Sequence, residues 1–417
     1  MSEYILKNFP GRKDLINWYK QQKPAGIPEI NAHLHTPYSF SAFNSMEQIF
    51  SMASSEKISV LGINDFFVAD GYDAFYKHSL QSRIFPLFNI EFIGLLVKEQ
   101  KNNIRVNDPN NPGRTYFCGK GLDYPHELEP QYECLLRNIR YESQIQMKEM
   151  IEKTNSIFHS LSPKISLKYS EIKRLYAREL VRERHIARAI RMAVFDKLKS
   201  ENERSEFLKK LFNGKEVKSD LNNEAAMENE IRANLLKAGG RAFVAEDPAT
   251  FLPLPEIIEI ILDAGGIPCY PVLLDDSNGK YTEYESNKQS LLKELEAMNV
   301  FCIELIPGRN DLAILKDFVQ FFHDNKFVIT FGTEHNTPEL IPLLVTARGN
   351  QPLDPDLKKI SWEGASVIAA HQYLHARGEE GYIKIDGRAN RDRLDEFIEL
   401  GKAVIGKFIS GENLITG

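Results

Sequence analysis

The chain has 417 residues, of which 42% are hydrophobic and 26% are charged, so it contains enough apolar material for a sizeable core. Its formal net charge of -6 excludes the strongly basic surface of a dedicated nucleic-acid-binding protein. The four cysteines are scattered and form no CxxC pair, which favours reduced thiols over a disulfide framework or a zinc–cysteine site.

The sequence also lacks the signals of a membrane or secreted protein. It contains no run of about 18 apolar residues, and its first twenty residues lack the apolar stretch of a signal peptide. We therefore expect a cytoplasmic protein with neither a membrane nor a nucleic-acid partner. The composition does not indicate an oligomeric state.

Residues 26–124 alternate short apolar runs with polar stretches. Runs rich in aromatic and branched residues predict strands, and the segments between them predict helices. The predicted strands are 27–36, 58–65, 83–97 and 114–120, and the predicted helices are 46–57 and 72–81. This alternation is typical of parallel α/β units.

Residues 125–244 have a different texture, dense in Glu, Lys, Arg and Leu with few glycines. Between residues 172 and 194, apolar side chains recur at helical spacing and share one face: Ile172, Tyr176, Leu180, Ala187, Ile190 and Val194. The pattern predicts an all-helical insertion. It leaves open whether the insertion has a role of its own or only connects two parts of the fold.

From residue 245 the α/β texture returns, with a last amphipathic helix over 391–409. Predicted strands are 266–274, 300–306 and 326–332, and predicted helices are 254–264, 290–298 and 312–325. About seven strands, mostly followed by helices, predict a parallel (β/α) barrel. We assign the barrel to residues 26–124 and 245–385, an N-terminal extension to 1–25, and a C-terminal helix on the barrel to 386–417.

In such barrels the chemistry lies where the strands end, and the first predicted strand ends in His33 and His35. Strand side chains alternate between two faces, so both imidazoles point to one side and Leu34 to the other. Two imidazoles on one face at a strand end can chelate one metal ion. An HxH pair alone, however, is common by chance.

Acidic residues follow the other strands. Asp65 ends the second strand, and Glu91 follows an apolar run, where a carboxylate is costly unless it is paired or metal-bound. Glu334 and His335 come directly after the last predicted strand. Each of these residues can instead be an ordinary surface or salt-bridged group. Their shared place at strand ends predicts one cluster at the barrel mouth.

The order of these motifs resembles that of the PHP (polymerase and histidinol phosphatase) domain superfamily over residues 28–124 and 245–345. NAHLHTPYS resembles its opening D-x-H-x-H-T-x-x-S motif, FPLFNIEFIG its glutamate motif, and FGTEHNTPE its closing G-S-D-x-H motif. GINDFFVADGYDAFY and DAGGIPCYPVL resemble two further motifs, and RERHIARAI is similar to a stretch in the helical insertion of the phosphoesterase-like branch. The resemblance implies a distorted (β/α)7 barrel whose metals activate water against phosphate esters.

The resemblance implies one metal held by the HxH pair, the glutamate and the closing acid, here His33, His35, Glu91 and Glu334. The residues of two further metal positions are replaced by aromatic or amide side chains: Tyr116, Tyr270, Phe40, Phe66 and Asn336. We therefore expect a single site, walled by aromatic rings, that holds one divalent transition metal. Two histidines and two carboxylates suit Zn, Mn or Fe(II).

Four other residues are candidates to assist. His185 in the insertion can act as a general acid or bind an anion if the insertion leans over the barrel mouth, with Arg182, Arg184 and Arg188 beside it, or it can face solvent. Asp65 can orient a histidine or act as a base, or it can cap a helix. Arg309 can bind a phosphate or carboxylate, or be an ordinary loop residue. His335 lies one position earlier than the histidine of the closing motif. It can be a metal ligand, or it can donate a hydrogen bond to one of the ligands.

The first hypothesis is a metal-dependent hydrolase acting on a small anionic substrate, a phosphate ester above all. His33, His35, Glu91, Glu334 and His335 would serve the metal, and His185, Asp65 and Arg309 would assist. The second is a non-catalytic descendant that binds a ligand or a protein. A third is a one-metal lyase on a sugar-derived substrate, with Tyr116 or Tyr270 as acid or base.

Overall fold

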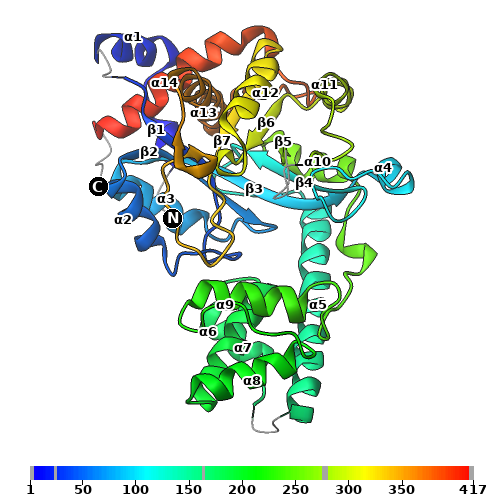
Figure 1. The fold of residues 1–417 in the computed structure, drawn as a ribbon. Helices are drawn as coiled ribbons and strands as arrows, with labels where there is room; N and C mark the ends of the chain where they lie inside the picture. Colours follow the sequence, from blue (N-terminus) through cyan, green and yellow to red (C-terminus); the bar gives the residue numbers. More distant parts are fainter. Residues whose placement is uncertain (1–3, 23–25, 162–164, 275–279, 413–417) are drawn as a thin grey trace.

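The computed structural model describes residues 4–22, 26–161, 165–274 and 280–412. Its centre is a seven-stranded sheet whose strands follow one another in chain order, from β1 (Glu29–Leu34) to β7 (Val328–Phe331) (Figure 1). The first and last strands also meet, because Leu34 pairs with Glu334 and the His35 amide donates to the Glu334 carbonyl at 2.7 Å. The sheet therefore closes into the expected barrel.

One strand departs from the parallel arrangement that the sequence predicts. β4 (Arg114–Lys120) runs antiparallel to both β3 (Phe85–Leu95) and β5 (Ile267–Val272), whereas the other neighbouring strands are parallel. A parallel pair needs a crossover, usually helical, that returns the chain to the same end of the sheet. Between β3 and β4 the chain forms only the five-residue α4 (Val97–Lys101), so β4 returns in the opposite direction.

The remaining strands and the flanking helices lie close to their predicted ranges. They are β2 (Ile58–Phe66), β6 (Cys302–Leu305), α2 (Met46–Ser55), α3 (Tyr72–Ser82), α10 (Leu254–Asp263), α11 (Lys288–Ala297), α12 (Leu312–Asp324) and α14 (Leu394–Ser410). Side chains cap several helix starts: Ser45 accepts from the Gln48 amide before α2, and Asp311 from the Ala313 amide before α12. Three helices were not predicted: α1 (Arg12–Gln22), α4 and α13 (Pro355–Ala376).

Barrel closure depends on a close approach of β7 to β1. A Cβ atom on Gly332 would lie 2.3 Å from the Cβ of His33, a separation that side chains do not adopt. Only glycine fits at this point, which follows β7 directly. The glycine thus lets the last strand lie against the segment that carries the HxH pair.

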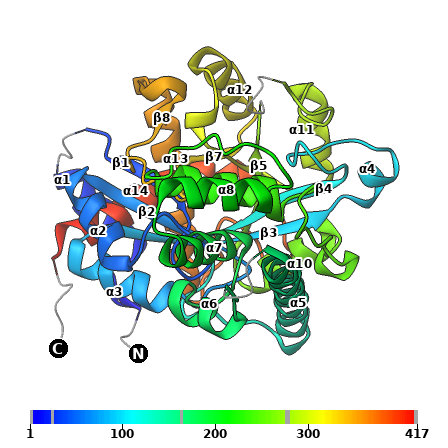
Figure 2. The ribbon, with the colours of Figure 1, turned by 60° about the horizontal axis from the view of Figure 1, so that its bottom comes forward.

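The region from α5 to α9 forms a second hydrophobic core below the barrel (Figure 1). It contains the 32-residue α5 (Pro130–Leu161), α6 (Tyr169–Tyr176), α7 (Glu183–Lys197), α8 (Glu201–Leu211) and α9 (Glu224–Ile231). Seen from the insertion side, α6, α7 and α8 lie in front of the barrel strands (Figure 2). The all-helical character that the composition predicts is confirmed.

The helix that periodicity predicts over residues 172–194 is broken. Residues 177–182 are not helical and separate α6 from α7. Within this break the amides of Arg178 and Leu180 donate to the carbonyls of Pro37 and Tyr38, in the loop after β1, at 3.3 and 3.5 Å. Contact with the barrel mouth thus replaces helical hydrogen bonds, a tertiary effect that local periodicity does not encode.

Within the described ranges, each helix is too short or too polar to cross a membrane.

Candidate metal centre

Three ligand atoms form the centre of the site: they belong to His33 in β1, His35 directly after β1, and Glu91 in β3. His35 Nε2 lies 3.0 Å from Glu91 Oε2, His33 Nε2 lies 3.8 Å from the same oxygen, and the two imidazole nitrogens are 3.4 Å apart. Nitrogen and oxygen ligands bind zinc at about 2.0–2.2 Å, so atoms that share one ion lie roughly 3–4 Å from one another. The three side chains therefore have the spacing of a metal-binding triad.

Hydrogen bonds at the opposite ring nitrogens orient both imidazoles. His33 Nδ1 lies 2.7 Å from Glu304 Oε1, and His35 Nδ1 lies 3.2 Å from the Ser39 hydroxyl, which itself donates to Asp65 Oδ1 at 2.6 Å. A carboxylate, and a hydroxyl whose proton is already donated, can each accept from Nδ1–H. Both rings then carry their proton on Nδ1 and present an Nε2 lone pair toward Glu91, as ligating histidines commonly do.

Asp65 lies next to the loop after β1 and accepts hydrogen bonds from it. Its carboxylate accepts from the Thr36 amide at 2.7 Å, the Thr36 hydroxyl at 2.5 Å and Ser39. Burial raises the pKa of Asp65, although His35 and these donors oppose the shift. The residue therefore fixes the loop after β1 and, through Ser39, the His35 ring.

The Glu91 carboxylate is the group of this site that lacks compensation. It is 3% exposed, and its Oε2 atom has no hydrogen-bond partner among the described residues, because its approach to His35 does not have hydrogen-bond geometry. Burial raises the pKa of Glu91 to about 8, and Glu334 and Glu304 add to the shift while His33 opposes it. Burial also lowers the pKa of His35 to about 4. An orphaned buried carboxylate oxygen that faces two imidazole nitrogens fits a divalent cation.

Glu334 lies near this triad but is engaged elsewhere. Its carboxylate forms an ion pair with the Arg309 guanidinium. The charge of Glu334 is nevertheless felt at the site, since it contributes to the pKa shifts of His35 and Glu91. The structure thus brings both predicted residues to the barrel mouth, paired with each other.

His335, which the sequence analysis included among the metal residues, does not join the triad. Its Nδ1 lies 2.7 Å from the Thr333 hydroxyl, its Nε2 lies 2.9 Å from the Ile341 carbonyl, and its ring stacks on Phe43 at 4.8 Å. The cause is local: Glu334 and His335 both adopt positive φ angles, 66° and 56°, so the chain turns sharply after β7. Both ring nitrogens are occupied by a structural role.

His185 is placed over the barrel mouth, which settles the choice between solvent and site. It is 2% exposed, and its ring meets the edge of Phe40 at 4.9 Å. Its Nδ1 accepts from the Arg182 amide at 3.0 Å, and burial, aided by Arg188 and Arg182, lowers its pKa to about 3. A neutral imidazole with Nε2–H can donate a hydrogen bond to an anion, which is one of the two roles that the sequence suggests for His185.

The aromatic replacements occupy different environments. Phe66 stacks on His35 at 4.8 Å, and its ring centre lies 6.2 Å from that of Tyr116. Tyr270 is fully buried and donates its hydroxyl to Glu285 at 2.8 Å. Burial raises the pKa of Glu285 to about 7. Tyr270 is thus committed to a hydrogen bond with Glu285.

The sequence analysis missed Glu304 and Lys120. Both are completely buried inside the barrel, where Lys120 Nζ lies 2.5 Å from Glu304 Oε2 and 3.2 Å from Asn64 Oδ1. Burial alone would raise the pKa of Glu304, but His33 and Lys120 outweigh it and lower the pKa to about 2. The signal that drew attention to Glu91, a carboxylate inside an apolar strand, was equally present in VFCIELI.

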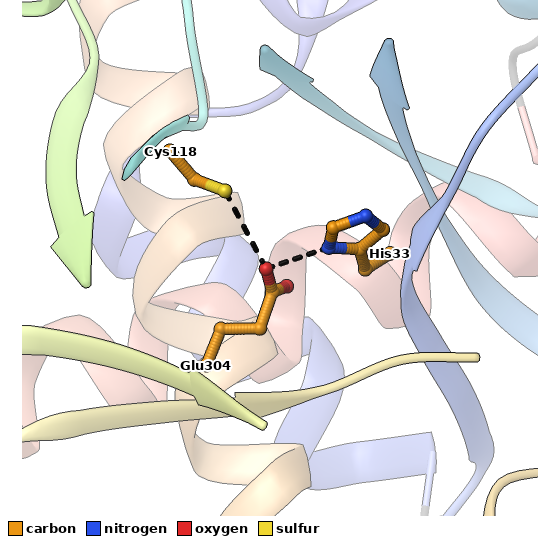
Figure 3. A group of neighbouring side chains, drawn as sticks. All are labelled: His33, Cys118 and Glu304. Carbon is orange, nitrogen blue, oxygen red and sulfur yellow. Dashed lines mark hydrogen bonds and ion pairs between the residues drawn. The ribbon is translucent and has the colours of Figure 1, made fainter. Parts of the chain in front are cut away.

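A second group of possible ligands shares His33 with the first. His33, Cys118 and Glu304 bring ligand atoms within 4.8 Å of one another, as do His33, His35 and Glu91. Figure 3 shows Glu304 between His33 and Cys118, with one carboxylate oxygen facing both. Two further histidines, His371 and His375, lie one turn apart on α13. They do not form a candidate metal site, because both ring nitrogens of His371 are engaged, one by the Gly265 carbonyl and the other by the Tyr382 amide.

Comparisons with known proteins agree with this architecture. The PHP domain family model matches residues 31–211. A search of curated proteins finds no match. A solved structure from Bifidobacterium adolescentis ATCC 15703, named as a metal-dependent phosphoesterase, covers 81% of this chain and 96% of its own at 15% identity and a TM-score of 0.53.

A second structure, an amidohydrolase from Chromobacterium violaceum solved with sulfate and no metal, covers 80% of this chain and 95% of its own at 14% identity and a TM-score of 0.49. At 15% identity, the likeness to the structure from Bifidobacterium adolescentis describes the fold alone. Together with the motif order, the closed seven-stranded barrel and the clustered HxH pair, the family match shows that this chain contains a PHP domain.

Proposed function

We propose that this chain is a metal-dependent hydrolase in which His33, His35 and Glu91 hold one divalent transition metal, Zn, Mn or Fe, and that it acts on a small anionic substrate, a phosphate ester. The observation that carries the proposal is the orphaned, buried Glu91 oxygen facing two Nε2 lone pairs. The named activity of the phosphoesterase from Bifidobacterium adolescentis supports the same reaction class.

The charges around the site support one metal rather than several. Glu304 is paired with Lys120, Glu334 with Arg309, and Asp65 accepts three hydrogen bonds. Of these four acidic groups, Glu91 alone lacks a compensating partner. One divalent ion would supply that compensation, because buried carboxylates are stable when paired or metal-bound.

A divalent ion bound there would supply a Lewis acid and lower the pKa of a water molecule at the barrel mouth. The chain's own residues would do the rest. Glu304 would orient the His33 ring directly, by accepting a hydrogen bond from its Nδ1. Asp65 would orient the His35 ring indirectly, through the Ser39 hydroxyl that lies at its Nδ1. The surrounding side chains would exclude bulk water from the ligands, because His33 and His35 are at most 1% exposed.

The substrate anion would be received by Arg182 and His185. The Arg182 guanidinium lies 4.9 Å from the centre of the Phe66 ring and makes no ion pair or side-chain hydrogen bond among the described residues. Its positive charge is felt by His35, and it lies close enough to Tyr116 for a mutual electrostatic effect. A partly buried guanidinium without a partner suits recognition of a phosphate or carboxylate.

The test is hydrolysis of p-nitrophenyl phosphate and bis-p-nitrophenyl phosphate by metal-free protein reconstituted with Mn(II), Zn(II) or Fe(II). We expect turnover with at least one metal and its loss in His35→Ala. His375→Asn is the matched control, because that histidine pairs with Asp123 away from the site. Tight metal binding without turnover of either ester would exclude this proposal and favour a binding protein or a lyase.

A further inference from the structure

We propose that Lys120 is a resident cation that closes a second metal position, formed by His33, Cys118 and Glu304, and so limits the centre to one ion. The inference rests on the proposed metal centre and concerns the other side of the same histidine. His33 directs Nε2 to Glu91 and Nδ1 to Glu304.

The donor atoms of the second position have the right kind and spacing. Glu304 Oε1 lies 2.7 Å from His33 Nδ1 and 3.7 Å from Cys118 Sγ, and the three atoms lie within 4.8 Å of one another (Figure 3). Once His33 Nδ1–H and the Cys118 thiol have released their protons to solvent, an imidazolate shared with the first ion, a thiolate and a carboxylate would form a ligand set that zinc accepts. The three side chains come from β1, β4 and β6, so the barrel wall holds them in place.

Lys120 supplies, at the other oxygen of the same carboxylate, the charge that an ion would bring. Its side chain is 0% exposed, and its ammonium donates to Glu304 Oε2 at 2.5 Å and to Asn64 Oδ1 at 3.2 Å. With Lys120 in place, Glu304 is neutralised, and its other oxygen remains an acceptor for His33. A metal ion at the same carboxylate would face an ammonium group fixed beside it, which is strongly repulsive in a buried environment.

With Lys120 beside it, the group formed by His33, Cys118 and Glu304 would serve the structure of the barrel and would bind no ion. A lysine amine cannot coordinate while it is protonated, and it offers no water to a substrate. Lys120 would instead preserve the charge balance of the barrel and hold His33 in the tautomer that leaves Nε2 for the metal at Glu91. It is therefore a positioning residue that also excludes a second ion.

The experiment measures bound metal per folded chain by inductively coupled plasma mass spectrometry after saturation with Zn(II) and desalting. Lys120→Met keeps an unbranched side chain of similar length but removes the charge. We expect one ion in the unaltered chain and two in Lys120→Met. The double variant Lys120→Met/Glu304→Gln removes the acid as well and should return to one ion. Replacing both partners of a buried pair is commonly tolerated.

Cobalt gives a second readout that a general loss of structure would not produce. In Lys120→Met, Co(II) should show the near-ultraviolet charge-transfer absorption of a thiolate ligand, and adding Cys118→Ser should remove it. Lys120→Gln is made in parallel. Its amide can still donate a hydrogen bond to Glu304 Oε2, so this neutral variant should fold even if Lys120→Met does not. In either neutral variant, a second ion supports the proposal.

Two results would overturn the proposal: a second ion in the unaltered chain, or one ion only in every neutral variant that folds. The unaltered chain alone therefore tests the inference even if both neutral variants fail to fold. An unaltered chain that binds no metal would instead remove the proposed metal centre, which separates the two failures.

Discussion

Phe66 lies face to face with His35, with ring centroids 4.8 Å apart and planes inclined by 24°. The Arg182 guanidinium approaches the same phenyl ring at 4.9 Å. A side chain of the barrel mouth thus connects a proposed metal ligand to a residue of the helical insertion. This contact explains how the insertion can influence the site without contributing a metal ligand.

Replacing Phe66 by Leu should weaken this connection without abolishing the site. We expect a loss of about 1 kcal/mol in unfolding free energy, because aromatic stacking beyond simple burial is worth about 0.5–1.5 kcal/mol. Zinc affinity, measured by competition with a chromophoric chelator, should fall less than tenfold, since Ser39 still holds His35 Nδ1. A hundredfold loss would show that Phe66 is the main support of His35.

Asp65→Asn should have the larger effect on metal affinity. The carboxylate accepts from two Thr36 groups and from Ser39, and an amide would place a donor against one of them. Loss of the residue behind a ligating histidine commonly costs 10–100-fold in metal affinity, and we expect a loss in that range. An Asp65→Asn protein that binds zinc as tightly as the unaltered chain would contradict the orienting role.

Arg182→Met tests the anion-binding role. Hydrogen bonds to charged groups are worth about 1.5–3 kcal/mol, so the KM for a phosphate ester should rise by 10-fold or more. Stability should change little, because the guanidinium has no ion pair to lose among the described residues, and its unfavourable burial offsets the loss of its contacts with Phe66 and Phe67. Arg191→Met, in the helix α7 that begins directly after Arg182, is the matched control. It leaves the buried Glu228 without its closest cation, so it should destabilise the fold and leave KM unchanged. Equal effects on KM would rule out a specific role for Arg182.

Metal affinity should depend on pH through Glu91. Its pKa is raised from 4.5 to about 8 in the folded, metal-free protein, so the protonated form is favoured and a metal must displace that proton below pH 8. Affinity should rise about tenfold per pH unit from pH 6 to pH 8 and then level off. Isothermal titration in buffers of different ionisation enthalpy measures the released proton. Binding at pH 7 without proton release would contradict this assignment.

The same raised pKa affects the stability of the metal-free protein. Between pH 4.5 and 8 the native state binds more protons than the unfolded state, so the contribution of Glu91 to metal-free stability falls as the pH rises.

The sequence predicts those parts of the fold and site that depend on local pattern. Alternation placed His33 and His35 on one face, and a carboxylate within an apolar run singled out Glu91. The same argument applied to Glu304. Its contacts with His33 and Lys120, however, can be recognised only from the fold, which brings β6 together with β1 and β4. Long-range contacts of this kind decide which buried charge is paired, and no sequence spacing encodes them.

The wrong expectations have the same origin. The direction of β4 depends on the short connection before it, and the break after α6 depends on hydrogen bonds to the loop after β1. His335 is turned away from the metal position by two consecutive residues with positive φ. In each case a tertiary contact or a backbone turn overrides a pattern that is sound in isolation.

Anomalous diffraction from crystals grown with Mn(II) tests the central claim most directly. The account predicts one peak per chain, about 2.2 Å from His33 Nε2, His35 Nε2 and a Glu91 oxygen. A peak between Cys118 and Glu304, or the absence of any peak at the three predicted atoms at full saturation, would contradict it.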